Sequence, residues 1–408
     1  MDLLRWTLVI IGHIGIWCSI FNLIHSTSLP RSFRKRTEKA ILLALAAPFL
    51  FFLVIMILQN TWSFDLISRI SFVGMFLYAM LGFGCFFMVT WLYRKLTTRL
   101  PSAVKKGETQ LLNLREELGG DLFGNAACRA IGKLPFNECL TLALEPMSIK
   151  LDIPRELDGL KICQLSDLHY TGQINVEYFQ RIVEEANKFE PDLIIITGDL
   201  VDEAKCLPWL EITLGRLQAK HGVYYVLGNH DLRIKDETGF RNQLKDLGLI
   251  QASGKWHDIE IDGATVRITG NELPWYSDVE KLATEPSPPD LKILLSHSPD
   301  QLEWAKPRGF DLMFAGHTHG GQIAFPIVGP IVAPSKYGVL YAAGTFEIEG
   351  MIMHVSRGIS GDEPIRLCCP PEVGLFTIQS SRVEEGGKAG KSDEQTLSKS
   401  NDLQPQSS

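Results

Sequence analysis

The chain lacks a cysteine framework: its 408 residues include 8 cysteines, and no two of them form a CxxC pair. This excludes a small secreted scaffold held together by disulfides. Cys18 and Cys85 lie inside apolar runs, where cysteine acts as a small hydrophobic residue. We interpret the adjacent Cys368 and Cys369 as structural cysteines in a reducing compartment, with redox activity or metal binding as the alternatives.

Positive charge is also scarce over most of the chain. The whole sequence has 40 Lys and Arg against 47 Asp and Glu, whereas the first 100 residues have 10 against 3. The rest is therefore acidic, and it shows no basic patch of the kind that binds nucleic acid. This division indicates a membrane-associated front and an acidic soluble body, with no nucleic-acid partner.

Three runs near the N-terminus lack charged side chains: residues 6–24, 40–60 and 70–93. About 20 apolar residues cross the ~30 Å hydrocarbon core as a helix. We therefore predict three transmembrane helices within a membrane region of residues 1–100. The first run is the weakest, and a cleavable signal peptide is its alternative, although it has no small-residue cleavage site. Its His13 is expected to make an interhelical hydrogen bond or to lie at headgroup level.

The orientation follows from the loops. Residues 31–39 hold five cationic side chains and more follow the third run from Arg94 to Lys106, whereas the loop around Asp65 and Arg69 is balanced. The positive-inside rule then places both basic segments, and the body, in the cytoplasm. We predict a multi-pass protein of a bacterial-type inner (plasma) membrane. No run holds an acidic residue, so the region is interpreted as an anchor, with a pore or a transporter fragment as the alternatives.

The remaining chain divides into three parts. Residues 101–139 are polar and dotted with glycine, which predicts a connector with a short amphipathic helix over 110–120. Residues 140–379 form the body. Residues 380–408 have almost no large apolar side chain and are predicted to be a disordered tail.

The body alternates short apolar runs with helical stretches. Five β-rich runs each end in a polar cluster: KICQLSD, DLIIITGD, GVYYVLGNHD, LKILLSH and DLMFAGHTH. Stretches with apolar residues three and four apart lie between several of them, as over 176–191, 207–218 and 239–248. This pattern predicts an α/β fold of mostly parallel, buried strands with helices on both faces. Polar groups at the carboxyl ends of such strands converge on one crevice, where we expect the site.

These strand ends carry residue types that bind metals: Asp167, His169, Asp199, Asp202, Asn229, His230, Asp231, His297, His317 and His319. One aspartate after a strand is usually a cap, but five such strand ends predict a polynuclear metal site. Two divalent ions ~3.5–4 Å apart need a bridging carboxylate, neutral imidazoles and open positions for water and substrate. Mixed His, Asp and Asn ligation excludes a structural zinc site of thiolate type and fits Mn, Fe or Zn alike.

The same residues resemble the motif series of the calcineurin-like metallophosphoesterases. The five blocks are intact and in order over residues 140–379: Asp167-Leu168-His169, Gly198-Asp199, Gly228-Asn229-His230-Asp231, His297 and Gly316-His317-Thr318-His319. The resemblance implies a β-sandwich with flanking helices. The preceding membrane helices and the extension Gly320-Gly321-Gln322 resemble the membrane-anchored branch of the family. That branch includes bacterial transmembrane phosphodiesterases and a UDP-2,3-diacylglucosamine diphosphatase of lipid A synthesis.

The resemblance also implies roles for individual residues. The implied ligands form two sets that share a bridging Asp199: Asp167, His169 and His319 for one ion, and Asn229, His297 and His317 for the other. A metal-bridging hydroxide would attack phosphorus in line. His230 would stabilise the phosphoryl oxygens or protonate the leaving oxygen, with Asp231 orienting its imidazole. A structural role is the alternative for His230, and Asp202 is interpreted as a cap or as a group supporting the ligands.

The expected function is that of a membrane-anchored, two-metal phosphoesterase that cleaves a phosphodiester or diphosphate bond. An amphiphilic, lipid-linked substrate such as UDP-2,3-diacylglucosamine would explain the anchor. A broad phosphodiesterase acting on cyclic nucleotides or phospholipid headgroups is the alternative enzyme, and a non-catalytic membrane scaffold is the alternative from another class. Phosphoprotein phosphatases of the family carry an arginine after the second block, where this chain has Asp202-Glu203. That difference disfavours a Ser/Thr phosphatase.

Overall fold

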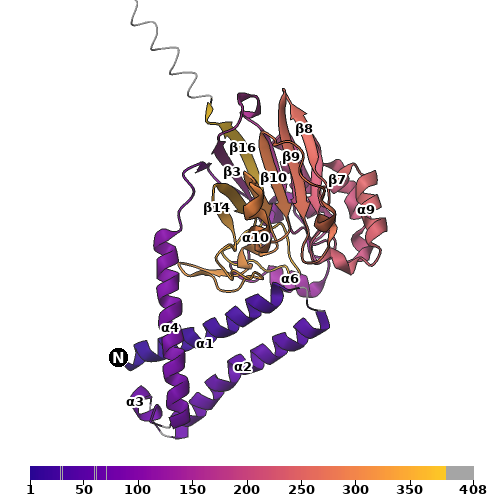
Figure 1. Cartoon of the computed structure of the whole chain (residues 1–408). Helices are drawn as coiled ribbons and strands as arrows, with labels where there is room; N and C mark the ends of the chain where they lie inside the picture. The colour runs from indigo at the N-terminus through magenta and orange to yellow at the C-terminus, as the bar shows by residue number, and fades with distance from the viewer. Residues whose placement is uncertain (28, 30, 59, 61, 70, 383–408) are drawn as a thin grey trace, which may run out of the picture.

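The computed structural model has an N-terminal region of apolar helices beneath an α/β domain (Figure 1). It describes residues 1–382 except 28, 30, 59, 61 and 70. The tail predicted over 380–408 therefore lies outside the described residues from position 383 onward.

Two sheets form the framework of the domain. The first has eight strands: β1 (Val104–Lys106), β2 (Gln110–Asn113), β3 (Thr141–Leu151), β4 (Lys161–Leu165), β5 (Leu193–Thr197), β6 (Val223–Val226), β7 (Leu249–Gln251) and β16 (Glu372–Ser380). The second has six: β8 (His257–Ile261), β9 (Ala264–Asn271), β10 (Leu291–Ser296), β11 (Leu312–Ala315), β14 (Gly344–Ile348) and β15 (Met351–Val355). A separate two-stranded hairpin joins β12 (Ala324–Phe325) to β13 (Gly329–Pro330).

The sheets pack face to face as a sandwich. Ile195 of the first sheet and Leu295 and Phe314 of the second are each at most 1% exposed and belong to one buried cluster. Strands β4, β5, β6 and β7 run parallel to one another, as do β9, β10, β11 and β15. These strands are buried on both faces, and their sequences are therefore nearly continuous apolar segments. The structure confirms the predicted α/β fold.

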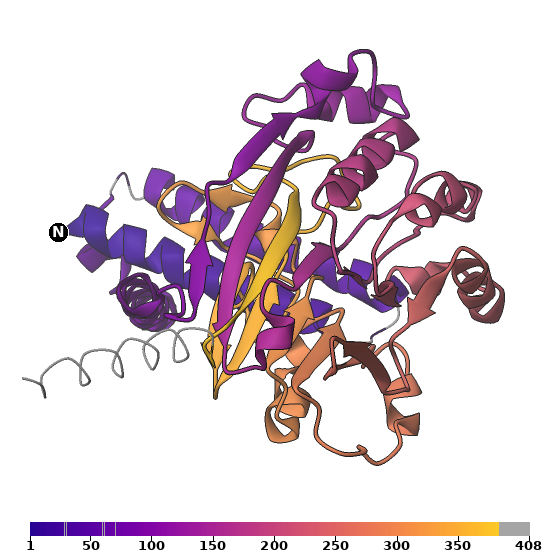
Figure 2. The ribbon, with the colours of Figure 1, turned by 90° about the horizontal axis from the view of Figure 1, so that it is seen from above.

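Helices cover the outer faces of both sheets. Seen from above, the helices that follow the central strands lie to one side of them (Figure 2). The flanking helices are α5 (Leu114–Leu118), α6 (Ala126–Gly132), α7 (Val176–Lys188), α8 (Trp209–Ile212), α9 (Glu237–Asp246) and α10 (Leu302–Ala305). In α7, Phe179, Ile182 and Ala186 are buried against the first sheet, which is the spacing of an amphipathic helix.

Two segments differ from the expected helices. The segment 110–120 forms β2 followed by α5, because β2 pairs with the free edge of β3 and satisfies its backbone groups there. The helix expected over 207–218 is divided into α8 and a 3₁₀ turn at Leu214–Arg216. At the break, the hydroxyl of Thr213 donates a hydrogen bond to the carbonyl of Trp209 at 2.6 Å, and such side-chain bonds compete with a regular helix.

The N-terminal region contains α1 (Asp2–His25), α2 (Arg31–Leu58), the short α3 (Phe64–Ile67) and α4 (Ser71–Thr97). By length and composition α1, α2 and α4 could each cross a membrane. The start of α1 lies beside α3, where Arg5 Nη1 is 2.7 Å from Asp65 Oδ1. The end of α1 reaches the α/β domain, where Asn22 Oδ1 accepts a hydrogen bond from the backbone N–H of Ala333 at 3.0 Å. Thus α1 extends from α3 to the domain.

Close backbone packing joins α1 to the other helices. A Cβ added to Gly12 would lie 2.0 Å from the carbonyl oxygen of Met80, so only glycine allows α1 and α4 to approach this closely. The next residue faces α2: His13 Nε2 donates a hydrogen bond to the carbonyl of Leu45 in that helix at 3.1 Å. The expected interhelical hydrogen bond of His13 is confirmed.

A buried polar network connects the two sheets. Glu372 of β16 accepts a hydrogen bond from His354 Nε2 of β15 at 3.0 Å and pairs with Arg357 Nε at 3.2 Å. Arg357 also donates to Glu145 of β3 at 2.8 Å. Burial disfavours the charged carboxylate of Glu372, but Arg357 and His354 outweigh burial and lower its pKa to about 2.

We expect Glu372→Gln to destabilise the detergent-solubilised protein by about 3 kcal/mol at pH 7, because it removes one partner of a buried ion pair. A lowered folded-state pKa contributes stability above the unfolded value of about 4.3. That contribution is lost as the pH falls toward about 2, so the difference between the two proteins should shrink over this range. Thermal unfolding of both proteins at several pH values measures it.

The matched control is Glu347→Gln, which changes an exposed glutamate of β14 and should leave the unfolding temperature unaltered. A deficit for Glu372→Gln that is the same at every pH would contradict the proposed charge pairing.

Candidate metal centre

The polar ends of five strands meet at one edge of the sandwich. The residues expected at the site follow β4, β5, β6, β10 and β11 in turn: Asp167, His169, Asp199, Asn229, His230, Asp231, His297, His317 and His319. The structure brings them together from the two sheets, because parallel strands end at the same edge.

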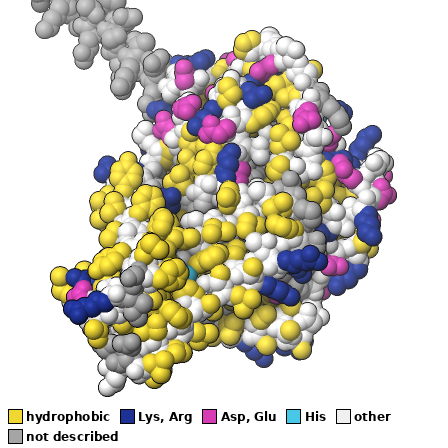
Figure 3. Space-filling model, turned by 60° about the horizontal axis from the view of Figure 1, so that its bottom comes forward, with side chains coloured by type: hydrophobic (Ala, Val, Ile, Leu, Met, Phe, Trp, Pro, Cys, Tyr) yellow, Lys and Arg dark blue, Asp and Glu magenta, His cyan; other side chains and the backbone are white. Residues whose placement is uncertain are grey.

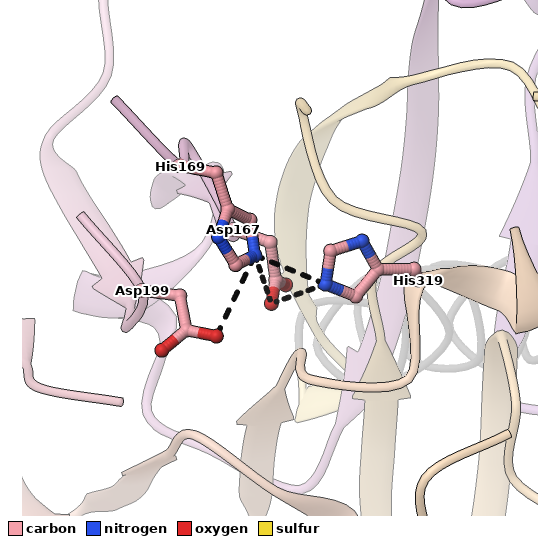
Figure 4. A group of neighbouring side chains, drawn as sticks. All are labelled: Asp167, His169, Asp199 and His319. Atoms are coloured by element: carbon pink, nitrogen blue, oxygen red, sulfur yellow. Dashed lines mark hydrogen bonds and ion pairs between the residues drawn. The ribbon is translucent and has the colours of Figure 1, made fainter. Parts of the chain in front are cut away.

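Four of these side chains converge on one point (Figure 4). His319 Nε2 lies 3.3 Å from Asp167 Oδ1 and 3.1 Å from His169 Nε2. His169 Nε2 is in turn 3.5 Å from Asp199 Oδ2. The ligand atoms of all four residues lie within 4.8 Å of one another, so they could hold one metal ion.

A second group adjoins the first through Asp199. Its Oδ2 atom lies 3.2 Å from His297 Nε2, and His297 Nε2 is 3.2 Å from His317 Nδ1. Asn229 Oδ1 is 3.1 Å from the same nitrogen of His297. Asp199, His297 and His317 form a further group that could hold a metal ion. One carboxylate oxygen therefore faces both groups.

Hydrogen bonds behind the site fix the orientation of the imidazoles. The Nδ1 atom of His169 donates to Asp202 Oδ2 at 2.7 Å, and that of His319 donates to the carbonyl of Ser360 at 3.2 Å. His297 Nδ1 donates to the carbonyl of Thr197 at 2.7 Å. Such bonds leave Nε2 as the atom that can bind a metal. The facing Nε2 lone pairs of His169 and His319 repel each other unless a cation lies between them, so the donor set fits a divalent ion.

The electrostatic field of the site favours positive charge. Burial alone would lower the pKa of His169, but the carboxylates of Asp202, Asp199 and Asp167 outweigh burial and raise it to about 10. Burial disfavours ionised Asp199, yet His297 and His230 hold its pKa well below the ordinary value. A proton or a metal ion can supply the positive charge that these carboxylates attract, and the two compete for the same nitrogen atoms.

The backbone at the site adopts a conformation that is uncommon for side chains other than glycine. The φ angles of Asp167, His169, Asp199, His317 and His319 are 51°, 47°, 54°, 70° and 51°. Left-handed residues cost free energy and cluster at functional sites. Gly316 permits the closest approach, because a Cβ there would lie 1.9 Å from Ser166 Oγ and 2.4 Å from Asp167 Oδ2.

The orientation of His230 differs from the expectation. Its Nδ1 donates to Asp202 Oδ1 at 2.5 Å, so Asp202 connects the imidazoles of His230 and His169. Asp231 instead accepts hydrogen bonds from the backbone N–H groups of Leu200, Val201 and Gly228 at 2.8–3.0 Å. Burial and the charge of Asp199 raise the pKa of Asp231 to about 7. Asp231 therefore holds the loops together, and Asp202 takes the orienting role that the sequence analysis gave to Asp231.

Two further charged residues surround His230, and the sequence analysis did not identify them. Arg233 Nη1 lies 2.6 Å from Asp202 Oδ1 and 2.9 Å from Asp362 Oδ1. Arg233 follows the Asn-His-Asp block by two residues, which was an available signal. No such signal pointed to Asp362, because 129 residues separate it from Arg233 in the sequence. His230 is 17% exposed whereas His169 is 1% exposed, so His230 lies at the mouth of the site.

An aromatic ring covers the second group. The ring of Trp275 is centred 5.2 Å from that of His297 and 5.0 Å from that of His317. Trp275 lies outside the five blocks, in the apolar piece ELPWYSD. Trp209 shows the contrast, since it packs against Tyr170 and Phe179 in the core.

Comparison with known proteins gives the family. The sequence profile of the calcineurin-like phosphoesterases matches residues 160–321. An uncharacterised metallophosphoesterase of Bacillus subtilis, YkuE, is 31% identical over 245 residues, which cover 56% of this chain and 82% of that protein. A bovine transmembrane protein with a metallophosphoesterase domain is 28% identical over 411 residues, covering 92% of this chain and 88% of that protein.

A third relative has a named substrate. The UDP-2,3-diacylglucosamine pyrophosphatase LpxG of Chlamydia trachomatis is 26% identical over 275 residues, covering 54% of this chain and 84% of that protein. The profile match and the similarity to YkuE both extend over the strand ends that hold the candidate metal ligands. The chain therefore belongs to the calcineurin-like metallophosphoesterases, a family of metal-dependent phosphoester hydrolases.

Proposed function

We propose that this protein is a membrane-anchored phosphoesterase with a two-metal centre. The observation that carries the proposal is the position of Asp199 Oδ2, which lies 3.5 Å from His169 Nε2 and 3.2 Å from His297 Nε2 and so faces both ligand groups. The proposed ligands are Asp167, His169 and His319 for one ion, Asn229, His297 and His317 for the other, and Asp199 for both. When bound, two divalent ions activate water near neutral pH and neutralise charge on phosphoryl oxygens.

The chain itself supplies an acid at the mouth of the site. Asp202 accepts the Nδ1–H of His230, so a proton for the leaving oxygen would be held at Nε2. Arg233 Nη2 lies 3.5 Å from this Nε2 and adds positive charge where the phosphoryl oxygens would lie. Asp202 and Asp362 hold the Arg233 guanidinium in place.

The proposed substrate is an amphiphilic phosphodiester or diphosphate presented at a bilayer surface. Two findings support it: three apolar helices precede the domain, and one relative is named for a lipid nucleotide. UDP-2,3-diacylglucosamine is the specific candidate, and a broad phosphodiesterase is the alternative. The complete set of proposed ligands and His230 argue against a scaffold without turnover.

We further propose three membrane crossings with the domain on the cytoplasmic side of the plasma membrane. The course of α1 supports this orientation, because the helix begins beside α3 and ends against the domain. The basic segments 31–39 and 94–106 therefore lie toward the domain, and basic segments face the cytoplasm.

Asp199→Asn should lower the bound metal from about two ions per chain to one or none, because the shared carboxylate contributes to both groups. Turnover of bis-p-nitrophenyl phosphate should fall by roughly 10³-fold. Elemental analysis of the purified protein measures the metal content. The control Asp246→Asn, at an exposed position of α9, should change neither quantity. Two ions retained by Asp199→Asn would exclude the shared ligand.

His230→Ala should keep both ions and lower kcat by about 10²–10⁴-fold, as expected for loss of a general acid. The loss should be larger for an alkyl leaving group than for p-nitrophenol, because p-nitrophenol leaves without protonation. Parallel kinetics of the two substrates test this difference. Equal losses for both leaving groups would indicate that His230 acts only through its charge.

The substrate is tested with the full chain in detergent, loaded with Mn, by following release of UMP from UDP-2,3-diacylglucosamine beside hydrolysis of bis-p-nitrophenyl phosphate. Rapid UMP release that Asn229→Ala and His230→Ala abolish is the expected result. Hydrolysis of the artificial diester alone would support the broad phosphodiesterase. Inactivity on both substrates with metal still bound would support the scaffold.

A further inference from the structure

An apolar hairpin projects from the domain immediately after the last proposed metal ligand. It carries five large hydrophobic side chains that are partly or mostly exposed, here called the apolar rim: Ile323, Phe325, Ile327, Val328 and Ile331. Ile327 is 81% exposed and Phe325 49%. Single exposed apolar residues are ordinary on a soluble surface, but a group of them on one hairpin marks an interaction site.

The rim is connected to the metal centre by a short, well-bonded segment. Gly320, Gly321 and Gln322 separate the apolar rim from His319. The backbone N–H of Gln322 donates to the carbonyl of His319 at 2.9 Å. Its side chain donates to the carbonyl of Glu363 at 3.0 Å, next to Asp362 at the mouth of the site. The apolar rim therefore lies close to the opening through which a substrate reaches the proposed ligands.

The other side of the hairpin contacts the helices that could span a membrane. The indole N–H of Trp91 in α4 donates to the carbonyl of Val328 at 3.1 Å. Asn22 at the end of α1 binds the backbone of Ala333, just beyond the rim. Trp91 precedes Arg94 and Lys95 in the last turns of α4, and Trp followed by basic residues is typical of the headgroup level of a membrane.

The hydrophobic surface of the helices continues onto the domain. Figure 3 shows hydrophobic side chains covering the helices and extending over the adjoining underside of the domain with few charged groups between them. Residues 323–333 contain no charged side chain. Continuity with α1 and α4 identifies the occupant of this surface as the bilayer that surrounds the helices, rather than a soluble protein.

We propose that the apolar rim is seated in the membrane interface, with Ile327 and Val328 among the acyl chains. The metal centre then opens at the level of the lipid phosphates. This deepens the proposed function, and what it says about substrates rests on that function. The substrates are phosphoesters whose acyl chains remain in the bilayer while the headgroup enters the site.

Membrane contact is tested without any turnover. The full chain is reconstituted in phosphatidylcholine and phosphatidylglycerol vesicles, with a fluorescent coumarin amino acid replacing Ile327 in one variant and the exposed Glu260 of β8 in the other. Lipids carrying a nitroxide on the acyl chain should quench the fluorophore at 327 and not the one at 260. Equal, weak quenching at both positions would overturn the proposal, whether the rim lies in water or against a second protein chain.

The consequence for substrates is tested separately. Ile327→Asp should lower kcat/KM for a vesicle-embedded lipid phosphodiester by about 10-fold and leave hydrolysis of soluble bis-p-nitrophenyl phosphate unchanged, whereas Ile327→Leu should match the original protein on both. Equal losses on both substrates would mean that the hairpin supports the metal site instead. If the fluorophore at 327 is quenched but no variant turns over the lipid, the result supports the membrane contact and contradicts the lipid substrate.

Discussion

The buried negative charge of three aspartates at the edge of the sandwich is the constraint on which the rest of the site depends. Asp167, Asp199 and Asp202 are each at most 3% exposed, and an oxygen atom of each lies 2.7–3.9 Å from a ring nitrogen of His169. Buried carboxylates persist only when cations or hydrogen-bond donors offset them. The imidazoles provide part of that compensation. The Nδ1 atoms of His169, His297 and His319 are already bound to oxygen atoms behind the site, whereas His317 turns its Nδ1 toward His297. The remaining nitrogen atoms therefore point inward, where a metal ion completes the charge balance.

This constraint also explains the unusual backbone. A regular strand would keep Asp167 and His169 on one face, and likewise His317 and His319. The left-handed residues instead break the strand geometry where the side chains converge. The free-energy cost of these conformations is offset by the two sheets, whose apolar interior holds the strand ends in register. Folding and metal binding are consequently coupled, since the sandwich positions the carboxylates and the ion removes their repulsion.

The sequence predicted the alternation of strands and helices and the residues that meet at the strand ends, because both depend on local pattern and on the common direction of parallel strands. It did not reveal that Asp202 rather than Asp231 orients His230, since both follow strand ends and only the path of each loop decides which carboxylate reaches the imidazole. Asp362 was also missed, because its partners are distant in sequence. The strand β2 escaped prediction because its pairing depends on the free edge of β3, not on its own residues.

The short link between α4 and the first sheet limits how far the domain can move from that helix. α4 ends at Thr97 and β1 begins at Val104, so the six intervening residues span at most about 20 Å even when fully extended. The domain therefore cannot move far from the end of α4. For the proposed lipid substrate, encounters would then depend on the lateral diffusion of lipids past a nearly stationary domain. The rate would follow the surface density of substrate in one leaflet rather than its bulk concentration.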